Sequence, residues 1–406
     1  MSSHHFLFLT QTYPRYDGDT SGPFIRDLAR ALVRGGDRVS VLTPHAEDVP
    51  ASWDDDGVAV RSFRYAPTPL ELVGYSRSLD RDETLKGGAI ISAPLYAVGM
   101  LRAVRKFLAH NQVDLVHAHW VVPNGVIAAA VARHAPLAVG LHGSDVFLAE
   151  RAGVRRAVAA ALRRTSVLTG CSPELVERVC ALGFDTAYAH VIPYGVDVEQ
   201  FHPDPARRAE WRKKLGIPDD APLAVSVGRM ATKKGYQVLL DALPQLMVRS
   251  PELHIVLAGA GDRLNEFRQR AAPWGNRVHF PGRVLRDTLP DLYRAADIFV
   301  LPAVHDPKGN VDGLPNVILE GMASGLPVVA SRISGIPLAV EEGTTGRLIE
   351  EGDVAGLTDA LDELAGNPER AREMGQAGRR RAEAELTWDA VGRRYRAAYD
   401  QALTGH

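Results

Sequence analysis

Two acidic residues, Asp312 and Glu320, stand eight positions apart in the stretch DGLPNVILEGMASG. We expect DGLP to form a loop, because Gly frees the backbone and Pro interrupts it, and a helix to begin near Asn316. Such a loop brings backbone N–H groups and the positive end of a helix dipole to one place, which suits a phosphate. Carboxylates beside it can accept hydrogen bonds from hydroxyl groups. A nucleotide sugar carries both kinds of group.

A plainer interpretation makes Asp312 a solvated loop residue and Glu320 an ordinary exposed helix residue. The flanking segments favour the ligand interpretation. Residues 297–302 (DIFVLP) read as a buried strand, and residues 327–331 (PVVAS) read as the next one. The loop then lies at the carboxyl end of a parallel sheet, where open α/β folds bind their ligands.

Two cations follow another apolar segment, LAVSVG, at residues 223–228. Arg229 and Lys234 would lie at the carboxyl end of the same predicted sheet. Negative charge grows on a departing nucleoside diphosphate, and fixed cations stabilise that transition state more than the ground state. The alternative is a pair of solvated loop cations. The position after the strand favours the phosphate role.

His142 ends a further apolar segment, LAVGLH, at residues 137–142. A lone histidine is more often a core residue. Asp145 either belongs to an acceptor site or caps the helix that follows. His117 and His119 alternate on one predicted strand, and we interpret both as structural. The remaining weak candidates for an acceptor site are Tyr13, Arg15, Trp120 and Asn124.

The composition is that of an ordinary globular protein. The 406 residues include 47 basic and 49 acidic ones, so the net charge of −2 gives no basic field for nucleic acid. Only Cys171 and Cys180 are present, which predicts neither a disulfide framework nor a metal cluster. No apolar run reaches the roughly 20 residues of a membrane span, and the first residues lack the pattern of a signal peptide. We expect a cytoplasmic protein.

Strands alternate with helices in two separate runs along the chain, which predicts two doubly wound α/β domains. The segment at residues 193–205 is rich in Pro, Gly and acids, and we place the boundary there. We expect residues 1–198 to form the first domain, completed by a C-terminal helix at 387–406. Residues 199–386 would form the second domain.

The first domain begins with a predicted βαβ unit whose loop has no GxGxxG sequence. We expect Ser21 to cap its helix, which begins near Pro23. Residues 44–90 are polar and contain several prolines and a YSRSLDRDE run, so we expect them to include an excursion away from the sheet.

Several short segments together resemble one family, the family 4 glycosyltransferases of the GT-B fold. In order along the chain they read SGPF, LHGSD, IPYGVDVEQFHP, GRMATKKG, AGAGD, FPGRV, ADIFVLP and DGLPNVILEGMASG. They span nearly the whole chain, and the last segment together with GRMATKKG is specific. The resemblance implies two Rossmann-like domains that face each other across a cleft. The family has Glu where this chain has Asp312, and DGLP is similar to a branch that assembles bacterial surface polysaccharides.

The resemblance also implies roles for single residues. Glu320 would bind the ribose hydroxyls and Asp312 the hydroxyls of the donor sugar, while His142 would lie near that sugar. Arg229 and Lys234 would replace a divalent ion at the diphosphate, so no metal cofactor is expected. Lys233 is the less favoured partner, because the family pattern has its lysine directly before Gly235. The remaining donor contacts would come from backbone groups of Gly22, Arg283, Val284, Gly313 and Leu314.

The activity implied is a retaining transfer of a hexose from a nucleoside diphosphate sugar to a hydroxyl of a glycan, a lipid-linked sugar or a small molecule. Two alternatives stay open. One is a nucleotide-sugar epimerase or hydrolase of the same fold. The other is a non-catalytic nucleotide-sugar-binding subunit of a polysaccharide assembly complex. Turnover, and not binding, separates the enzymes from the binding subunit.

Five arginines gather in residues 151–164, RAGVRRAVAAALRR. A helix with this sequence could dock on anionic lipid at the inner face of a membrane, although its few bulky apolar residues predict only shallow insertion. A solvated basic face is an equally good interpretation.

Overall fold

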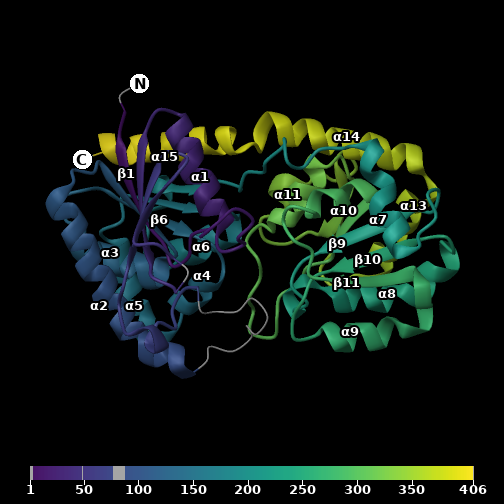
Figure 1. Cartoon of the computed structure of the whole chain (residues 1–406), viewed down its shortest axis with the longest axis horizontal. Helices are drawn as coiled ribbons and strands as arrows, with labels where there is room; N and C mark the ends of the chain where they lie inside the picture. Colours follow the sequence, from purple (N-terminus) through teal and green to yellow (C-terminus); the bar gives the residue numbers. More distant parts are fainter. Residues whose placement is uncertain (1–2, 48, 76–86, 406) are drawn as a thin grey trace. The chain divides into compact units, whose positions relative to one another are not determined.

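A computed structural model describes residues 3–47, 49–75 and 87–405 of the chain. The chain forms two compact units (Figure 1). Unit 1 comprises Met1–Gly195 together with Trp388–His406, and unit 2 comprises Val196–Thr387. Each unit is a parallel sheet with helices on both faces, as the alternating pattern predicts.

Unit 1 is built on a sheet of eight strands in the order β3-β4-β2-β1-β5-β6-β7-β8. All neighbouring pairs are parallel except β3 and β4. The inner strands β1, β5, β6 and β7 are buried along their whole length, which explains their uninterrupted apolar sequences. The strands are β1 His5–Leu9, β2 Arg38–Pro44, β3 Ser52–Asp55, β4 Val58–Phe63, β5 Leu115–His119, β6 Leu137–Leu141, β7 Val167–Gly170 and β8 Ala189–Val191.

The C-terminal helix α15 packs in unit 1 against helix α1, and the two lie together on one side of the sheet (Figure 1). Their close approach uses Gly392, because a side chain there would meet Ala31 of α1. Helices α2, α3 and α5 lie on the other side. The helices are α1 Pro23–Arg34, α2 Gly87–His110, α3 Val126–Val131, α4 Ser144–Ala149, α5 Ala152–Leu162, α6 Pro173–Cys180 and α15 Trp388–Thr404.

One expectation for unit 1 is wrong, and another holds for only part of its range. Within the polar stretch 44–90, residues 52–63 form the β3–β4 hairpin at the edge of the sheet, and the short helical turn Thr68–Leu70 lies outside the sheet. An edge strand with one solvated face carries polar residues, so its sequence resembles a loop. The YSRSLDRDE run lies almost entirely outside the described residues. Ser21 does not cap α1, because its hydroxyl donates to Asp19 and the N-cap position belongs to Gly22.

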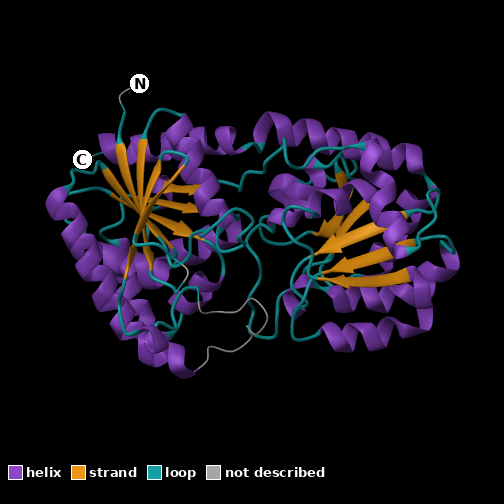
Figure 2. Cartoon of the chain, in the orientation of Figure 1, coloured by secondary structure: helices purple, strands orange, loops and turns teal. Residues whose placement is uncertain are grey.

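Unit 2 is built on a six-stranded sheet in the order β11-β10-β9-β12-β13-β14, and all its strands are parallel. The strand arrows of this unit point the same way in Figure 2, so their carboxyl ends share one edge. The strands are β9 Leu223–Val227, β10 His254–Ala258, β11 Val278–Gly282, β12 Ile298–Leu301, β13 Val328–Ser331 and β14 Gly346–Ile349.

The core of unit 2 lies mainly between this sheet and helices α8, α9 and α13. Helix α10 packs on α7, and α14 packs on α11. The bounds are α7 Arg208–Leu215, α8 Tyr236–Arg249, α9 Leu264–Ala271, α10 Leu289–Ala295, α11 Asn316–Ala323, α12 Ile336–Ala339, α13 Val354–Gly366 and α14 Pro368–Glu385.

The strand orders place a topological switch point in each unit. In unit 1 the order reverses between β1 and β5, and in unit 2 it reverses between β9 and β12. Loops that leave neighbouring strands in opposite directions leave room for a ligand at such a point. Within the described residues, no helix combines the length and the apolar character that crossing a bilayer requires.

Candidate functional site

The loops that follow β9 and β12 are fastened to each other at the switch point of unit 2. Gly235 ends the first loop in the left-handed conformation, with φ of 71°, and a Cβ there would collide with the carbonyl oxygen of Pro302. The amide of Val304 donates to the carbonyl of Lys233 at 3.1 Å. Only glycine fits this contact, so the KKG sequence holds two lysines against the residues that lead to Asp312.

Asp312 lies between those two lysines. Its Oδ1 is 2.7 Å from Nζ of Lys233, and its Oδ2 is 2.8 Å from Nζ of Lys234. Burial acts to raise the pKa of Asp312, but the charges of Lys234 and Lys233 outweigh it and hold that pKa well below its usual range. The side chain is 21% exposed. The interpretation of Asp312 as a solvated loop residue is therefore wrong.

Glu320 lies inside α11 and is buried, with 6% of its surface exposed, so it is not an ordinary surface residue of the helix. The hydroxyl of Tyr293, on α10, donates to its Oε2 at 2.9 Å. The guanidinium of Arg286 lies 3.7 Å from its Oε1. Burial and then the charge of Glu320 raise the pKa of Tyr293 well above its usual value, so the tyrosine stays a hydrogen-bond donor.

The start of α11 presents backbone groups beside these carboxylates. The carbonyl of Gly313 accepts from the amide of Gly335 at 2.6 Å, which fixes the loop. Within the described residues, the amides of Gly313 and Leu314 have no hydrogen-bond partner, although both residues are buried. Buried amides without partners are uncommon, and they match the donors that a phosphate oxygen needs.

The other predicted donor residues of unit 2 lie on loops at the same edge of the sheet. Arg229 follows β9 and is partly exposed. Arg283 and Val284 follow β11, and the arginine is exposed while the valine is half-buried. These positions agree with a shared ligand, because the carboxyl ends of parallel strands lie together.

Three histidines gather at the corresponding edge of unit 1. His119 of β5 and His142 after β6 are joined by a hydrogen bond of 3.1 Å between Nδ1 and Nε2. His142 also bonds through Nδ1 to the hydroxyl of Tyr194 at 2.7 Å. His117 stacks beside His119, with ring centroids 4.1 Å apart. Gly140 makes room for this group, because a Cβ there would lie 2.8 Å from Nε2 of His117.

Burial keeps this group of histidines neutral. It lowers the pKa of His117 and of His142 to about 3, and that of His119 well below its usual value. His117 and His119 are almost fully buried, whereas His142 keeps part of its surface exposed. Near pH 7, His142 can therefore offer a hydrogen bond to a ligand but not a positive charge.

We expect unit 1 to lose stability in mild acid. Because the folded-state pKa of each histidine lies below the unfolded value near 6.5, the unfolded chain binds more protons as pH falls through that value. Each such histidine should lower the free energy of unfolding by about 1.4 kcal/mol per pH unit below pH 6.5. Native-state hydrogen exchange in β5 and β6 between pH 7 and pH 5 measures this. His117→Gln should make the decline shallower, and an unchanged slope would show that His117 is not the proton acceptor.

Three of the weaker acceptor candidates in unit 1 are buried and hydrogen-bonded within the unit. Tyr13 is fully buried, and its hydroxyl donates to Asp55 at 2.6 Å. Asn124 is buried and donates to the carbonyl of His119. Asp145 does not cap α4 from the N-cap position. Its buried carboxylate accepts from backbone amides of residues 121, 142 and 143.

The other candidates of unit 1 stay accessible. Trp120 is partly exposed, adopts a positive φ of 69° and packs on His142 with ring centroids 5.0 Å apart. Arg15 is paired with Asp19 at 2.7 Å. Gly22 begins α1 in the left-handed conformation, with φ of 72°. The loops of Trp120 and Gly22 follow β5 and β1, the two strands at the switch point of this unit.

Sequence reasoning missed several side chains that contact the predicted residues. Lys233 was set aside in favour of Lys234, although both contact Asp312. Tyr293 and Tyr194 gave no signal, because each meets its partner only through the fold, across 27 and 52 positions of sequence. Arg286 could have been considered, since it lies three residues from the predicted Arg283.

The five arginines of the segment 151–164 are all exposed on or beside α5. Exposure agrees equally well with a solvated face and with a surface for anionic lipid. Contact with a membrane therefore stays a prediction.

Comparison with known proteins identifies the family to which the chain belongs. Residues 22–200 match the family described as Glycosyltransferase Family 4, and residues 207–381 match Glycosyl transferases group 1. The chain is 30% identical, over 88% of its length and 93% of the relative's, to a GDP-mannose-dependent monoacylated alpha-(1-6)-phosphatidylinositol monomannoside mannosyltransferase of Corynebacterium glutamicum. It is 29% identical to the putative teichuronic acid biosynthesis glycosyltransferase TuaC of Bacillus subtilis, over 81% of each chain.

Solved structures agree on the fold. A sucrose-phosphate synthase from Thermosynechococcus elongatus superposes with a TM-score of 0.78 at 20% identity, over 99% of this chain and 100% of that one. The catalytic domain of starch synthase IV from Arabidopsis thaliana superposes with a TM-score of 0.76 at 14% identity, over 99% and 100%. The chain therefore belongs to the family 4 glycosyltransferases, hexosyltransferases of the GT-B fold that use a nucleotide sugar as donor.

Proposed function

We propose that this enzyme transfers mannose from GDP-mannose to a hydroxyl of a lipid-linked or glycan acceptor, with retention of configuration. The observation that supports the donor site is that a lysine, a carboxylate and two buried amides without partners in the described structure lie at one loop junction. These groups belong to Lys234, Asp312, Gly313 and Leu314. GDP-mannose is chosen because several similar proteins are named as GDP-mannose-dependent mannosyltransferases.

In this proposal unit 2 holds the nucleoside diphosphate. The amides of Gly313 and Leu314 donate to phosphate oxygens at the start of α11, and Arg229 and Lys234 balance the charge. The buried carboxylate of Glu320 accepts hydrogen bonds from the ribose hydroxyls. Arg283 and Val284 contact the base through their backbone.

The reaction breaks the bond between the anomeric carbon and the β-phosphate oxygen, and forms a bond from that carbon to the acceptor oxygen on the same face. The leaving diphosphate takes up the proton of the acceptor hydroxyl. Cations fixed at the leaving group stabilise the transition state most, because its charge is then largest. From unit 1 we propose neutral His142 as a hydrogen-bond partner of the sugar, and Gly22 as a backbone contact of the β-phosphate.

We also propose that the two cations make a divalent ion unnecessary. The arrangement supports this because Lys234 contacts Asp312, the residue directly before the amides that would bind the diphosphate. Within the described part of the chain, no group of three or more His, Cys, Asp or Glu side chains could hold a metal ion. Turnover in the presence of EDTA should equal turnover with added Mg²⁺, and a requirement for Mg²⁺ would contradict this part of the proposal.

A panel of GDP-, UDP-, ADP- and TDP-sugars tests the donor. We expect GDP-mannose to stabilise the protein most, since a ligand present far above its Kd raises the free energy of unfolding by a few kcal/mol, ~3 at a hundredfold excess. Release of GDP should rise when lipid-linked mannosides or glycans are added. If only another nucleotide sugar stabilises the protein, the proposed donor is wrong but the proposed reaction class stands. Release that needs no acceptor would favour the hydrolase or epimerase.

Tyr293 should support ribose binding through Glu320. Tyr293→Phe removes the hydroxyl that donates to Oε2 of Glu320, so the carboxylate loses a contact that fixes its orientation. We expect calorimetry to show that GDP binds about threefold to tenfold more weakly. This range corresponds to the loss of one hydrogen bond to a charged group, when water partly replaces it.

The matched ligand for this test is 2′,3′-dideoxyguanosine diphosphate, which has no ribose hydroxyls at these positions. Its affinity should be nearly equal for the native protein and for Tyr293→Phe. An equal loss with both ligands would mean that Tyr293 supports the fold of the site and not the reading of the ribose.

A further inference from the structure

We propose that Lys233 is a positioning residue, which keeps hold of Asp312 so that Lys234 can leave that carboxylate and turn to the diphosphate of the donor. The inference rests on the proposed role of Lys234 and adds a function for the lysine beside it. Donor binding is then an exchange of partners among three charged side chains.

Asp312 has one cation on each of its oxygens. Lys233 lies 2.7 Å from Oδ1, and Lys234 lies 2.8 Å from Oδ2. Because the two ion pairs use different oxygens, Lys234 can exchange Oδ2 for a phosphate oxygen while Lys233 keeps its contact with Oδ1.

The backbone favours the same division of roles. The carbonyl of Lys233 accepts from Val304, in the loop that leads to Asp312, so Lys233 and its carboxylate partner belong to one fixed junction. Burial acts to raise the pKa of the neighbouring Asp306, but hydrogen bonds from Asn310 and Lys308 lower it, and the charge of Lys233 adds to this lowering.

The charges require a second lysine. A buried carboxylate without a partner is costly, and an anionic diphosphate nearby would add repulsion. If Lys234 were the only partner of Asp312, the diphosphate would have to compete for it and leave Asp312 uncompensated. With Lys233 in place, Asp312 keeps one cation and the diphosphate gains the other. The charge of Asp312 also acts on Tyr236, after burial the next cause that raises the pKa of that tyrosine, but Tyr236 supplies no positive charge.

The experiment is a double-mutant cycle on binding. Lys233→Met keeps the length of the side chain but removes the charge, and should weaken GDP and inorganic pyrophosphate about tenfold by calorimetry, the size expected for one charged contact. Asp312→Asn removes the competing carboxylate, so both ligands should bind at least as tightly as to the native protein. The double variant Lys233→Met/Asp312→Asn should regain native affinity. Lys233→Arg should stay close to native.

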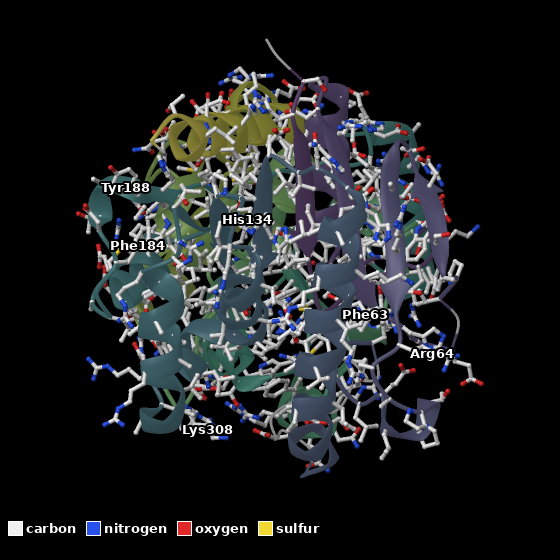
Figure 3. The ribbon with its side chains drawn as sticks, turned by 90° about the vertical axis from the view of Figure 1, so that its left-hand side faces the viewer. Phe63, Arg64, His134, Phe184, Tyr188 and Lys308 are labelled. Atoms are coloured by element: carbon white, nitrogen blue, oxygen red, sulfur yellow. The ribbon has the colours of Figure 1, made fainter. Side chains whose placement is uncertain are left out.

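A second readout is pH. In Lys233→Met, Asp312 should take up a proton more easily, so pyrophosphate binding should strengthen as pH falls from 7 to 5 relative to the native protein. Lys308→Met is the matched control, because Lys308 is an exposed lysine on the loop after β12 (Figure 3) and its loss changes the net charge equally. Thermal unfolding checks that all variants fold.

The outcomes separate this inference from the proposed function. If Lys233→Met remains weak in the double variant, Lys233 binds the phosphate directly and the inference is wrong. If Lys233→Met behaves as Lys308→Met does, Lys233 has no role and the inference is also wrong. In both cases the proposed donor site would still be supported if Lys234→Ala loses turnover. Native turnover in Lys234→Ala would remove the proposed site itself.

Discussion

Replacing Lys234 or Arg229 by alanine should lower kcat/KM by about a hundredfold or more, which corresponds to ~3 kcal/mol of lost transition-state stabilisation. Each cation is proposed to balance charge that grows on the leaving diphosphate, so the loss should fall mainly on kcat. Initial rates with saturating donor measure it. For Lys234 the loss should be accompanied by an unpaired Oδ2 on Asp312, since that lysine contacts this atom in the donor-free protein.

The controls for this prediction come from the same unit. Lys213→Ala and Arg372→Ala remove exposed cations of α7 and α14 and should leave kcat/KM unchanged. All four variants should unfold at nearly the native temperature, because none of the four side chains is buried. A Lys234 or Arg229 variant that turns over at the native rate with saturating donor would exclude that residue from the mechanism.

The alternation of apolar strands and helices was enough to predict both sheets, because inner parallel strands such as β5 and β12 are buried on both faces and read as continuous apolar runs. The same logic failed for β3 and β4. These strands form the edge of the sheet in unit 1. β3 is polar, and β4 alternates buried and exposed positions at its start, so neither reads as a continuous buried run. β4 is placed by its pairing with β2, and β3 by its pairing with β4, which no local pattern records.

The candidate site was predictable where a motif carries it and unpredictable where the fold assembles it. Asp312 and Glu320 stand in one short stretch, so their spacing alone directed attention to them. Tyr293 meets Glu320 from a different helix, and His119 meets His142 from a neighbouring strand. Burial of Tyr13 is likewise a property of the folded unit: a tyrosine in a polar loop reads as accessible until β3 covers it.

The two acids of the DGLPNVILEGMASG stretch should differ in which ligand binds more weakly when each acid is replaced. Glu320→Gln keeps the shape of the side chain but removes the charge that strengthens hydrogen bonds to the ribose hydroxyls. We expect it to weaken GDP and GDP-mannose by similar factors, about tenfold or more, because one charge-assisted hydrogen bond contributes roughly 1.5–3 kcal/mol. The buried position of Glu320 makes water a poor substitute for the lost interaction.

Asp312→Asn should behave differently. Its carboxylate is held by two lysines and is proposed to meet the hydroxyls of the donor sugar, which GDP does not have. The variant should therefore bind GDP at least as well as the native protein, while GDP-mannose and its turnover lose about tenfold or more. Calorimetry on both variants with both ligands yields the four affinities. Equal weakening of GDP and GDP-mannose in Asp312→Asn would contradict the sugar assignment, and would show that the main task of this carboxylate is to hold the lysines in the positions that the diphosphate requires.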